Sequence, residues 1–344
     1  MSAPILVTGA TGFLGHTLCP YLIKRGHRVR ALVRASSTWD FLLPLGVELA
    51  WGDVREAEAV RAATEGCRAV VHAAGKFRFW GPPESFYAVN LDGTRNALEA
   101  ARLAKVERFI YISTVAIIGA PRDGVVIDET YPPTPRDDYQ RSKLAAEQLT
   151  LRYYQEHGLP TLILRPGAFY GPGGRYAFNR LFFEDPLKGL QLQVHGGRHI
   201  NFPVYIQDVA QGVDLALARG RSGEVYDVSG CSLSHGEAND TVDRLLGYRI
   251  PRLNAPAWAM LALARVWTWL SRYTGREPYY PINLAPYVFY DWEVSSEKAR
   301  RELGFVPTPF EEGARETLAW YDELGVGPTN WLTKLIRRIT WRKL

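Results

Sequence analysis

Short apolar runs alternate with helical segments along the first half of the chain. The apolar runs are nearly continuous, as expected for parallel strands that are buried on both faces of a sheet. The expected strands cover residues 4–7, 29–33, 47–51, 69–73, 108–113 and 161–165. The expected helices between them include residues 14–25, 56–64, 94–104 and 142–157. This alternation predicts an α/β fold with a doubly wound parallel sheet and right-handed crossovers.

The pattern changes after Arg165, where glycine and proline become frequent and helices separate shorter β segments. We expect residues 1–165 to form the main domain and residues 166–326 to form mainly a smaller substrate-binding part. Residues 204–217 are expected to return to the main sheet. No linker is evident, so the two parts are predicted to be interleaved.

The charge balance argues against nucleic acid as a partner. The chain has 344 residues, 47% apolar and 22% charged, with a formal net charge of +5. The excess lies in residues 327–344, which contain no acid, and residues 1–326 are neutral overall. A nucleic-acid-binding core would need a basic face that this balance does not indicate. The basic residues of the tail are Lys334, Arg337, Arg338, Arg342 and Lys343.

The tail also carries an apolar stripe at helical spacing, formed by Trp331, Leu332, Leu335, Ile336 and Ile339. A basic amphipathic helix of this kind is typical of a segment that contacts an anionic membrane surface. Docking on the protein body or on a second subunit would use the same pattern.

Cysteine usage indicates a reducing compartment. Cys19, Cys67 and Cys231 are far apart and odd in number, which argues against a disulfide framework. No signal peptide is evident, and no apolar run reaches the roughly 18 residues that a spanning helix needs. We therefore expect a cytoplasmic protein, peripheral to the membrane if the tail binds there.

A glycine loop follows the first expected strand and opens the first helix. Gly9, Gly12 and Gly15 have the spacing GxxGxxG. In this context glycines permit a tight turn, close approach of the backbone to a pyrophosphate, and close packing of helix on strand. The helix N-terminus then offers free N–H groups to the phosphates. The loop predicts a dinucleotide-binding Rossmann domain, with Thr11, Phe13 and Leu14 also beside the cofactor.

The end of the second strand favours NADP(H), with NAD(H) as the alternative. An NAD site usually places an acid there, yet no acid lies between Gly15 and Asp40. Arg34 can pair with a 2′-phosphate instead, unless it is simply a solvated cation. Asp53 is placed to meet the adenine amino group, with capping of the next helix as its structural alternative. Val54 is expected beside it.

Tyr139 and Lys143 form a Tyr-x-x-x-Lys pair that a helix would place on one face. A phenol titrates near pH 10, about three units too high for proton transfer at neutral pH. A neighbouring ammonium and an oxidised nicotinamide would lower that pKa. Such pairs also occur by chance on helix surfaces, so its position in this fold matters. Ser113 and Thr114 end the preceding strand, where a hydroxyl could orient a substrate oxygen.

These elements together resemble the extended short-chain dehydrogenase/reductase superfamily, within the NAD-dependent epimerase/dehydratase family. The resemblance covers about residues 3–325. It is carried by the glycine loop at 8–15, Gly-Asp at 52–53, HAAG at 72–75, VNLDGT at 89–94, residues 139–143, RPG at 165–167 and YIQDVA at 205–210.

The resemblance implies Thr114, five residues before Gly119, as the catalytic hydroxyl, with Tyr139 as general acid/base and Lys143 holding the nicotinamide ribose. It implies a supporting role near the nicotinamide for Asn90, and homodimer formation. The remaining matched positions expected to contact the cofactor are Ala73, Ala74, Gly75, Pro166 and Gly167.

Departures from the superfamily pattern argue against some of the reactions that its members catalyse. Val115 and Ala116 stand where the 4,6-dehydratases carry an Asp-Glu pair, and neither can act as acid or base. Ile118 replaces a tyrosine typical of UDP-sugar epimerases. The sequence is similar instead to the 3β-hydroxysteroid dehydrogenase-like and dihydroflavonol-reductase-like branch at FWGPPE (79–84), GREP (275–278) and VSSEKA (294–299).

Large apolar side chains are frequent in the expected substrate-binding part, which favours a lipid-like small molecule unless these side chains are plain core. They are Phe178, Leu181, Phe182, Phe183, Trp258, Trp267, Trp269, Tyr279, Tyr280, Tyr287, Phe289, Tyr290 and Trp292. The histidines do not predict a metal site: His195 and His199 have no third ligand at a recognised spacing, and His72 is interpreted as a core residue.

The leading hypothesis is therefore an NAD(P)-dependent oxidoreductase acting on a secondary alcohol or ketone of a steroid-, isoprenoid- or similar lipid-like substrate. The alternatives are a nucleotide-sugar epimerase with tightly bound NAD, which predicts a diphosphate site near Arg175 or Arg180, and a non-enzymatic protein that kept the fold.

Overall fold

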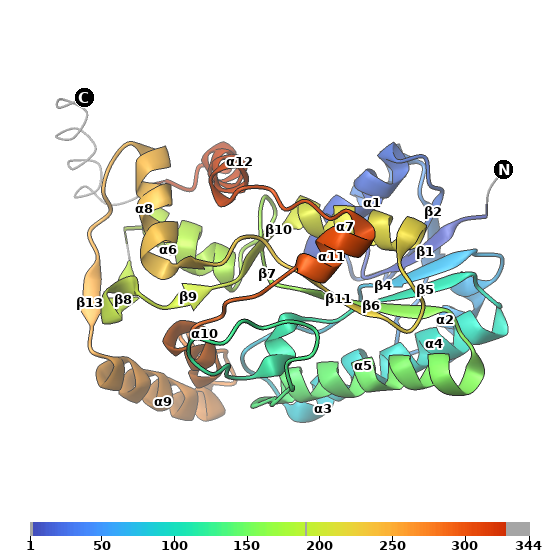
Figure 1. Ribbon diagram of the computed structural model, residues 1–344, viewed down its shortest axis with the longest axis horizontal. Helices are drawn as coiled ribbons and strands as arrows, with labels where there is room; N and C mark the ends of the chain where they lie inside the picture. The colour runs from blue at the N-terminus through green and yellow to red at the C-terminus, as the bar shows by residue number, and fades with distance from the viewer. Residues whose placement is uncertain (1–2, 190, 328–344) are drawn as a thin grey trace.

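The computed structural model describes residues 3–189 and 191–327, in which helices cover both faces of a parallel sheet (Figure 1). The strands of the sheet are β1 (Ile5–Thr8), β2 (Val29–Val33), β3 (Glu48–Trp51), β4 (Ala69–His72), β5 (Arg108–Ile112), β6 (Thr161–Pro166) and β11 (Val225–Val228). Within the described chain this is a 7-stranded sheet in the order β11-β6-β5-β4-β1-β2-β3, and its neighbouring strands are parallel. The predicted doubly wound Rossmann-type sheet is confirmed.

The apolar runs form strands because both faces of the sheet are covered. One layer holds α1 (Phe13–Lys24), α7 (Ile206–Arg219) and α11 (Glu297–Leu303), and the other holds α2 (Ala57–Thr64), α4 (Gly93–Leu103) and α5 (Asp138–His157) (Figure 1). Consecutive strand residues point to opposite faces. In β1, Ile5 and Val7 pack into the core under α1, whereas Leu6 packs into the core under α4.

One detail of the sheet differs from the sequence-based expectation: the seventh strand, β11, was not foreseen. Residues 204–217 were expected to return to the main sheet. They lie mostly in α7, which packs on β5 and β6, while β10 (Pro203–Tyr205) pairs with β7 (Ala168–Tyr170).

The second part of the molecule is built from short strands and helices that lie beside the C-terminal ends of the sheet strands (Figure 1). Besides β7 and β10, it contains α6 (Asp185–Leu187), β8 (Leu192–Val194), β9 (Ile200–Asn201), β12 (Leu233–Ser234), α8 (His235–Leu246), β13 (Leu253–Ala255), α9 (Ala257–Thr274), α10 (Ala285–Phe289) and α12 (Phe310–Glu323). Within this part, β9 pairs with β12 and β8 pairs with β13. A short helix of the first part, α3 (Pro83–Tyr87), packs on α5.

In the part of the chain that the structure describes, no helix is long and apolar enough to span a bilayer. The amphipathic tail predicted for residues 327–344 lies, from residue 328 onward, outside the described residues.

Candidate active site

The site lies where the order of the strands reverses, between β1 and β4. Strands β2 and β3 follow on one side of this point, and β5, β6 and β11 on the other. Ligands of open α/β sheets bind in the crevice outside the carboxyl ends of the strands at such a point. Here a cavity of about 610 Å³ opens, lined from one side by the glycine loop and from the other by the second part of the molecule.

The glycine loop has the close approaches that its spacing predicts. Gly9 has a φ of +73°, and a Cβ there would lie 2.7 Å from the backbone of Ala73 at the end of β4. A Cβ on Gly15 would lie 2.2 Å from the carbonyl oxygen of Ala10. Helix α1 begins without a side-chain cap and without an acid in its first turn. Its first N–H groups are therefore available to an anion, and the loop fits a pyrophosphate.

Most predicted cofactor residues line this cavity, but not all of them. Those that line it are Gly9, Gly12, Phe13, Leu14, Arg34, Ala73, Gly75, Tyr139, Lys143 and Gly167. Those that are not among the lining residues are Thr11, Gly15, Asp53, Val54, Ala74, Asn90 and Pro166. Gly15 lies against Ala10, in the close packing that was expected of the loop, and Val54 lies against Gly93.

Arg34 projects from the end of β2 with 60% of its side chain exposed. Its Nη1 lies 3.8 Å from Oδ2 of Asp53, so its guanidinium is largely uncommitted. Asp53 is engaged by Arg55, whose Nε and Nη2 donate to its two oxygens at 2.9 Å. The Arg55 hydrogen bond lowers the pKa of Asp53. The idea that Asp53 caps α2 is wrong, because the N-cap residue is Glu56.

Tyr139 and Thr114 meet inside the cavity. Helix α5 begins at Asp138, four residues earlier than expected, because the Asp137 carboxylate accepts a hydrogen bond from the Gln140 N–H at 2.8 Å. Tyr139 therefore stands in the first helical turn, and Tyr139 and Thr114 both line the cavity. Burial raises the pKa of Tyr139, while the nearby Thr114 side chain opposes the rise. In the protein on its own, burial thus outweighs the lowering that was expected from Lys143.

Lys143 lies one turn after Tyr139 and is buried. Its Nζ donates to the carbonyl oxygen of Ile112 at 2.6 Å and lies 4.3 Å from the centre of the Tyr111 ring. Burial lowers the pKa of Lys143 to about 7, against the opposing effect of Glu147. The ammonium is held at the end of β5, on the cavity wall.

Ser113 and Thr114 have different partners because of a buried ion pair that the sequence analysis missed. Glu147, one turn beyond Lys143 on α5, is bonded to Arg165 of β6, and both side chains are almost fully buried. The Ser113 hydroxyl donates to Glu147 at 2.6 Å and is therefore committed to this pair. The Thr114 hydroxyl accepts from the Ala116 N–H at 3.1 Å, and Thr114 lines the cavity together with Tyr139.

Asn90 and His72 are structural supports beside the cavity. Asn90 accepts from the Lys76 N–H at 2.7 Å and donates to the Ser142 hydroxyl at 2.9 Å, which ties the loop after β4 to α5. His72 is fully buried between the hydroxyls of Thr8 and Thr94, at 2.8 and 3.1 Å. The prediction that His72 is a satisfied core residue is confirmed, and burial lowers its pKa to about 3.

Aromatic rings form the substrate side of the cavity. Of the apolar residues singled out in the sequence, those that line it are Phe178, Leu181, Phe182 and Tyr287. Sequence analysis missed Phe77, whose ring centre lies 4.8 Å from that of Tyr139, and Tyr176, 5.5 Å from Phe77. Phe79, within the FWGPPE segment, completes this wall at 5.4 Å from Tyr176. Loops have no regular sequence periodicity, so the sequence pattern does not predict these ring contacts.

Other members of that apolar set serve elsewhere. Trp292 is fully buried and stacks on Phe202 and Tyr287, at 4.5 and 5.3 Å between ring centres. Trp258 and Trp269 of α9 are exposed. The set therefore contains core residues, cavity-lining residues and surface residues.

His195 and His199 pair with each other rather than with a third histidine or cysteine. Nδ1 of His195 lies 2.9 Å from Nε2 of His199, whose Nδ1 lies 3.0 Å from Oδ1 of Asp291. No group of three side chains that could hold a metal ion occurs among the described residues.

Comparison with known proteins agrees with this geometry. Residues 5–229 match the NAD dependent epimerase/dehydratase family. The chain is similar to the sterol demethylase protein B of Methylococcus capsulatus, with 31% identity over 93% of this chain and 99% of that protein. It is 30% identical to a 3-beta-hydroxysteroid dehydrogenase of Mycolicibacterium neoaurum, over 93% of this chain and 92% of that one. The solved UDP-glucose 4-epimerase of Thermus thermophilus, in complex with NAD, is 27% identical with a TM-score of 0.74, over 93% and 99% of the two chains.

Proposed function

The chain belongs to the NAD dependent epimerase/dehydratase family, and from this premise we propose that it is an NAD(P)-dependent oxidoreductase that interconverts a secondary alcohol and a ketone. The observation that carries the proposal is that Tyr139, Thr114 and Lys143 together line one largely aromatic cavity, with Lys143 one helical turn after Tyr139. This combination supplies an acid/base group, an orienting hydroxyl and a cation within one site.

Each residue has a distinct role in the proposed reaction. A nicotinamide bound in the glycine loop supplies or accepts the hydride. Tyr139 gives a proton to the substrate oxygen during reduction and takes it during oxidation. Thr114 holds that oxygen beside the Tyr139 hydroxyl. Lys143 places positive charge at the end of β5, which favours the phenolate form of Tyr139 and offers a donor to the ribose.

The substrate is proposed to be lipid-like. Phe77, Phe79, Tyr176 and Tyr287 present rings to the cavity, and an apolar pocket favours an apolar ligand. The relatives named for sterols and hydroxysteroids support the same class.

The assignment of Tyr139 is tested by Tyr139→Phe, with Tyr154→Phe as the matched control on an exposed position of α5. We expect Tyr139→Phe to lower turnover of a ketone with NADPH by about 10²- to 10⁴-fold. NADPH binding should be retained in both variants, because the ring and its packing remain. Turnover by Tyr139→Phe at the rate of Tyr154→Phe would refute the proposal.

NADP(H) is the proposed cofactor because Arg34 lines the cavity with a largely exposed side chain and the end of β2 carries no acid, since none lies between Gly15 and Asp40. Arg34→Leu should weaken NADPH binding by about tenfold or more and leave NADH binding nearly unchanged. Equal losses for the two cofactors, measured by fluorescence titration, would contradict this preference.

A nucleotide-sugar epimerase is the second candidate, supported by the likeness to a solved UDP-glucose 4-epimerase and by Arg175 on the cavity wall. Arg180, the other residue expected at a diphosphate, instead donates to the Tyr279 carbonyl at 2.5 Å and lies 3.5 Å from the Tyr279 ring centre. Interconversion of UDP-sugars without net consumption of added cofactor would establish this candidate in place of the first.

Two proposals concern partners. The resemblance to the superfamily supports a homodimer, which light scattering of the full chain would test. Membrane contact through residues 327–344 is tested by sedimentation with anionic vesicles before and after removal of these residues. Equal binding would exclude a role for the tail.

A further inference from the structure

A second, smaller compartment adjoins the active-site cavity. It has a volume of about 90 Å³ and shares Leu181, Phe182, His235 and Leu284 with the larger cavity as lining residues. These four side chains therefore border both spaces. We call the smaller space the distal compartment, because Tyr139 lines the larger cavity and not this one.

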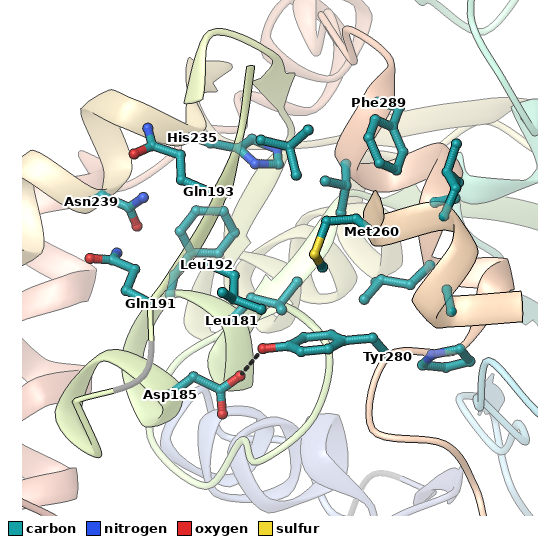
Figure 2. A pocket seen from close by; sticks show the side chains of 18 residues that line it. Leu181, Asp185, Gln191, Leu192, Gln193, His235, Asn239, Met260, Tyr280 and Phe289 are labelled. Atoms are coloured by element: carbon teal, nitrogen blue, oxygen red, sulfur yellow. Dashed lines mark hydrogen bonds between the residues drawn. The ribbon is translucent and has the colours of Figure 1, made fainter. Parts of the chain in front are cut away.

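The distal compartment has two unlike walls (Figure 2). Amide side chains gather on one side: Gln191 directly precedes β8, Gln193 lies in β8, and Asn239 comes from α8. Met260 of α9 and Phe289 of α10 lie on the other side. Asp185 also lines the compartment, but its carboxylate already accepts hydrogen bonds from the hydroxyls of Tyr279 and Tyr280. The uncommitted polar groups are therefore neutral.

Two buried polar atoms on this lining have no hydrogen-bond partner within the described chain: Oδ1 of Asn239 and Nε2 of His235. Asn239 is only 5% exposed. Burial lowers the pKa of His235 to about 4, so the ring is neutral at pH 7 and has one N–H donor and one acceptor nitrogen. Buried polar groups without partners are rare, and each costs free energy until a partner is supplied.

We propose that the distal compartment binds a hydroxyl group at the far end of the substrate, which donates its single proton to Oδ1 of Asn239 and pairs through its oxygen with the ring of His235. A hydroxyl is one donor and also an acceptor, so it can pair with both groups without bringing a charge. A carboxylate or phosphate would meet the Asn239 oxygen with like polarity, and a bare alkyl end would leave both groups unpaired. The substrate then carries two oxygen functions, one reacting at Tyr139 and one held in the distal compartment, joined by an apolar body. The statement that one oxygen function reacts at Tyr139 rests on the proposed function.

Matched probes test this inference by binding, independently of turnover. The probes are methyl ketones of increasing chain length, each with a terminal hydroxyl and each paired with its deoxy analogue. Calorimetry on the full chain with saturating NADP⁺, which cannot reduce a ketone, should show at least about tenfold tighter binding of the hydroxylated probe at the length that reaches the compartment. Equal binding of every pair would overturn the inference. Turnover of the same probes with NADPH, measured in a separate assay, reports on the proposed function.

Substitutions test which residues bind the hydroxyl group of the probe. Asn239→Leu should abolish the preference for the hydroxylated probe and still bind the deoxy probe, an outcome that misfolding cannot produce. Asn254→Leu, an exposed asparagine on β13, is the matched control and should keep the preference. His235→Phe provides a second test should Asn239→Leu fold poorly. A preference that survives both Asn239→Leu and His235→Phe would place the hydroxyl elsewhere and overturn the inference.

The outer face of α9 carries a second, independent inference. Trp258 and Tyr273 are each 74% exposed, and Trp269 is 53% exposed. Leu263, Val266 and Leu270 are also exposed on this helix. Both charged residues of α9 are arginines, Arg265 and Arg272, and the helix contains no acid. The opposite face, with Met260 and Ala264, lines the distal compartment.

We infer that α9 lies on an anionic lipid surface. Exposed Trp, Tyr and Leu side chains beside arginines match the apolar face and the charge of an interfacial helix. A helix facing lipid on one side and the distal compartment on the other would let an apolar substrate pass between them without crossing bulk water.

Vesicle sedimentation of the full chain tests this surface. Trp258→Ser with Trp269→Ser should lower partition onto phosphatidylcholine vesicles containing phosphatidylglycerol by at least about tenfold. Leu43→Ser with Trp51→Ser, exposed apolar residues elsewhere, is the control and should have no effect. Unchanged partition of the α9 variant would overturn the inference. So would self-association, seen by light scattering, that the α9 variant abolishes, because a second copy would then cover the helix.

Discussion

The two sides of the active-site cavity are built in different ways. The cofactor side consists of backbone at the ends of β1 and β4 and of the glycine loop, where close approaches admit only hydrogen in place of a side chain. The substrate side consists of aromatic rings from loops and short helices, among them Phe77, Tyr176 and Tyr287. The first side is a local arrangement of neighbouring residues, and the second is an assembly of segments far apart in sequence.

This difference teaches where sequence patterns are informative. A strand, a glycine loop and a helix follow one another within a few residues, so their spacing specifies their geometry. The rings of the substrate side meet only after the second part of the molecule has packed on the sheet. The following predictions test that contrast, beginning with the largest expected effect.

Trp292→Ala should destabilise the protein by about 3–5 kcal/mol, because it removes a fully buried ring stacked on Phe202 and Tyr287. Trp269→Ala, on the exposed face of α9, should change stability by less than about 0.5 kcal/mol. Urea unfolding measures both. Similar losses for the two tryptophans would mean that the substrate side does not depend on its ring packing.

Gly15→Ala tests the cofactor side. Its Cβ would lie 2.2 Å from the Ala10 carbonyl, so we expect a loss of about 1–3 kcal/mol in stability together with weaker NADPH binding. Gly236→Ala on α8 is the control, since its Cβ would lie no closer than 3.4 Å to a neighbour. Undiminished NADPH affinity in Gly15→Ala would show that the loop tolerates the added atom.

The buried His72, on the cofactor side, should make the stability of the protein depend on pH. Its pKa is about 3 in the folded protein and near 6.5 in the unfolded chain, so the unfolded state binds more protons between these values. Stability should therefore fall as the pH is lowered from 6.5, by at most about 1.4 kcal/mol per pH unit from this residue. Urea midpoints across that window should fall less steeply in His72→Gln. Identical slopes for wild type and variant would contradict the assignment.

Asp137→Asn should produce the smallest effect, at the junction of the two sides. The Asp137 carboxylate contributes to the raised pKa of Tyr139, and asparagine keeps the N-cap while removing the charge. The rise of alcohol oxidation with pH should move to lower pH by less than about one unit. A shift to higher pH, measured as kcat/KM against pH, would contradict the electrostatic link between these residues.

Much of the fold and of the reacting cluster was predictable from the sequence. The continuous apolar strands, the GxxGxxG loop and the Tyr139–Lys143 spacing are short-range patterns with short-range physical causes. The seventh strand β11 and the start of α5 at Asp138 were not foreseen, because a short strand and a cap depend on what packs around them. Glu147 and Arg165 likewise became a buried ion pair only through the meeting of α5 with β6.

By itself the sequence determined the doubly wound sheet, the glycine loop and the Tyr-x-x-x-Lys pair, since each follows from the spacing of neighbouring residues. Only the tertiary structure showed that the Ser113 hydroxyl is taken by a buried Glu147, which supports the Thr114 that the resemblance had implied. It also sorted the apolar residues into core, cavity and surface. The physical reason is that burial is a property of the packed chain: the same tryptophan is core at position 292 and surface at position 269 according to what lies against it.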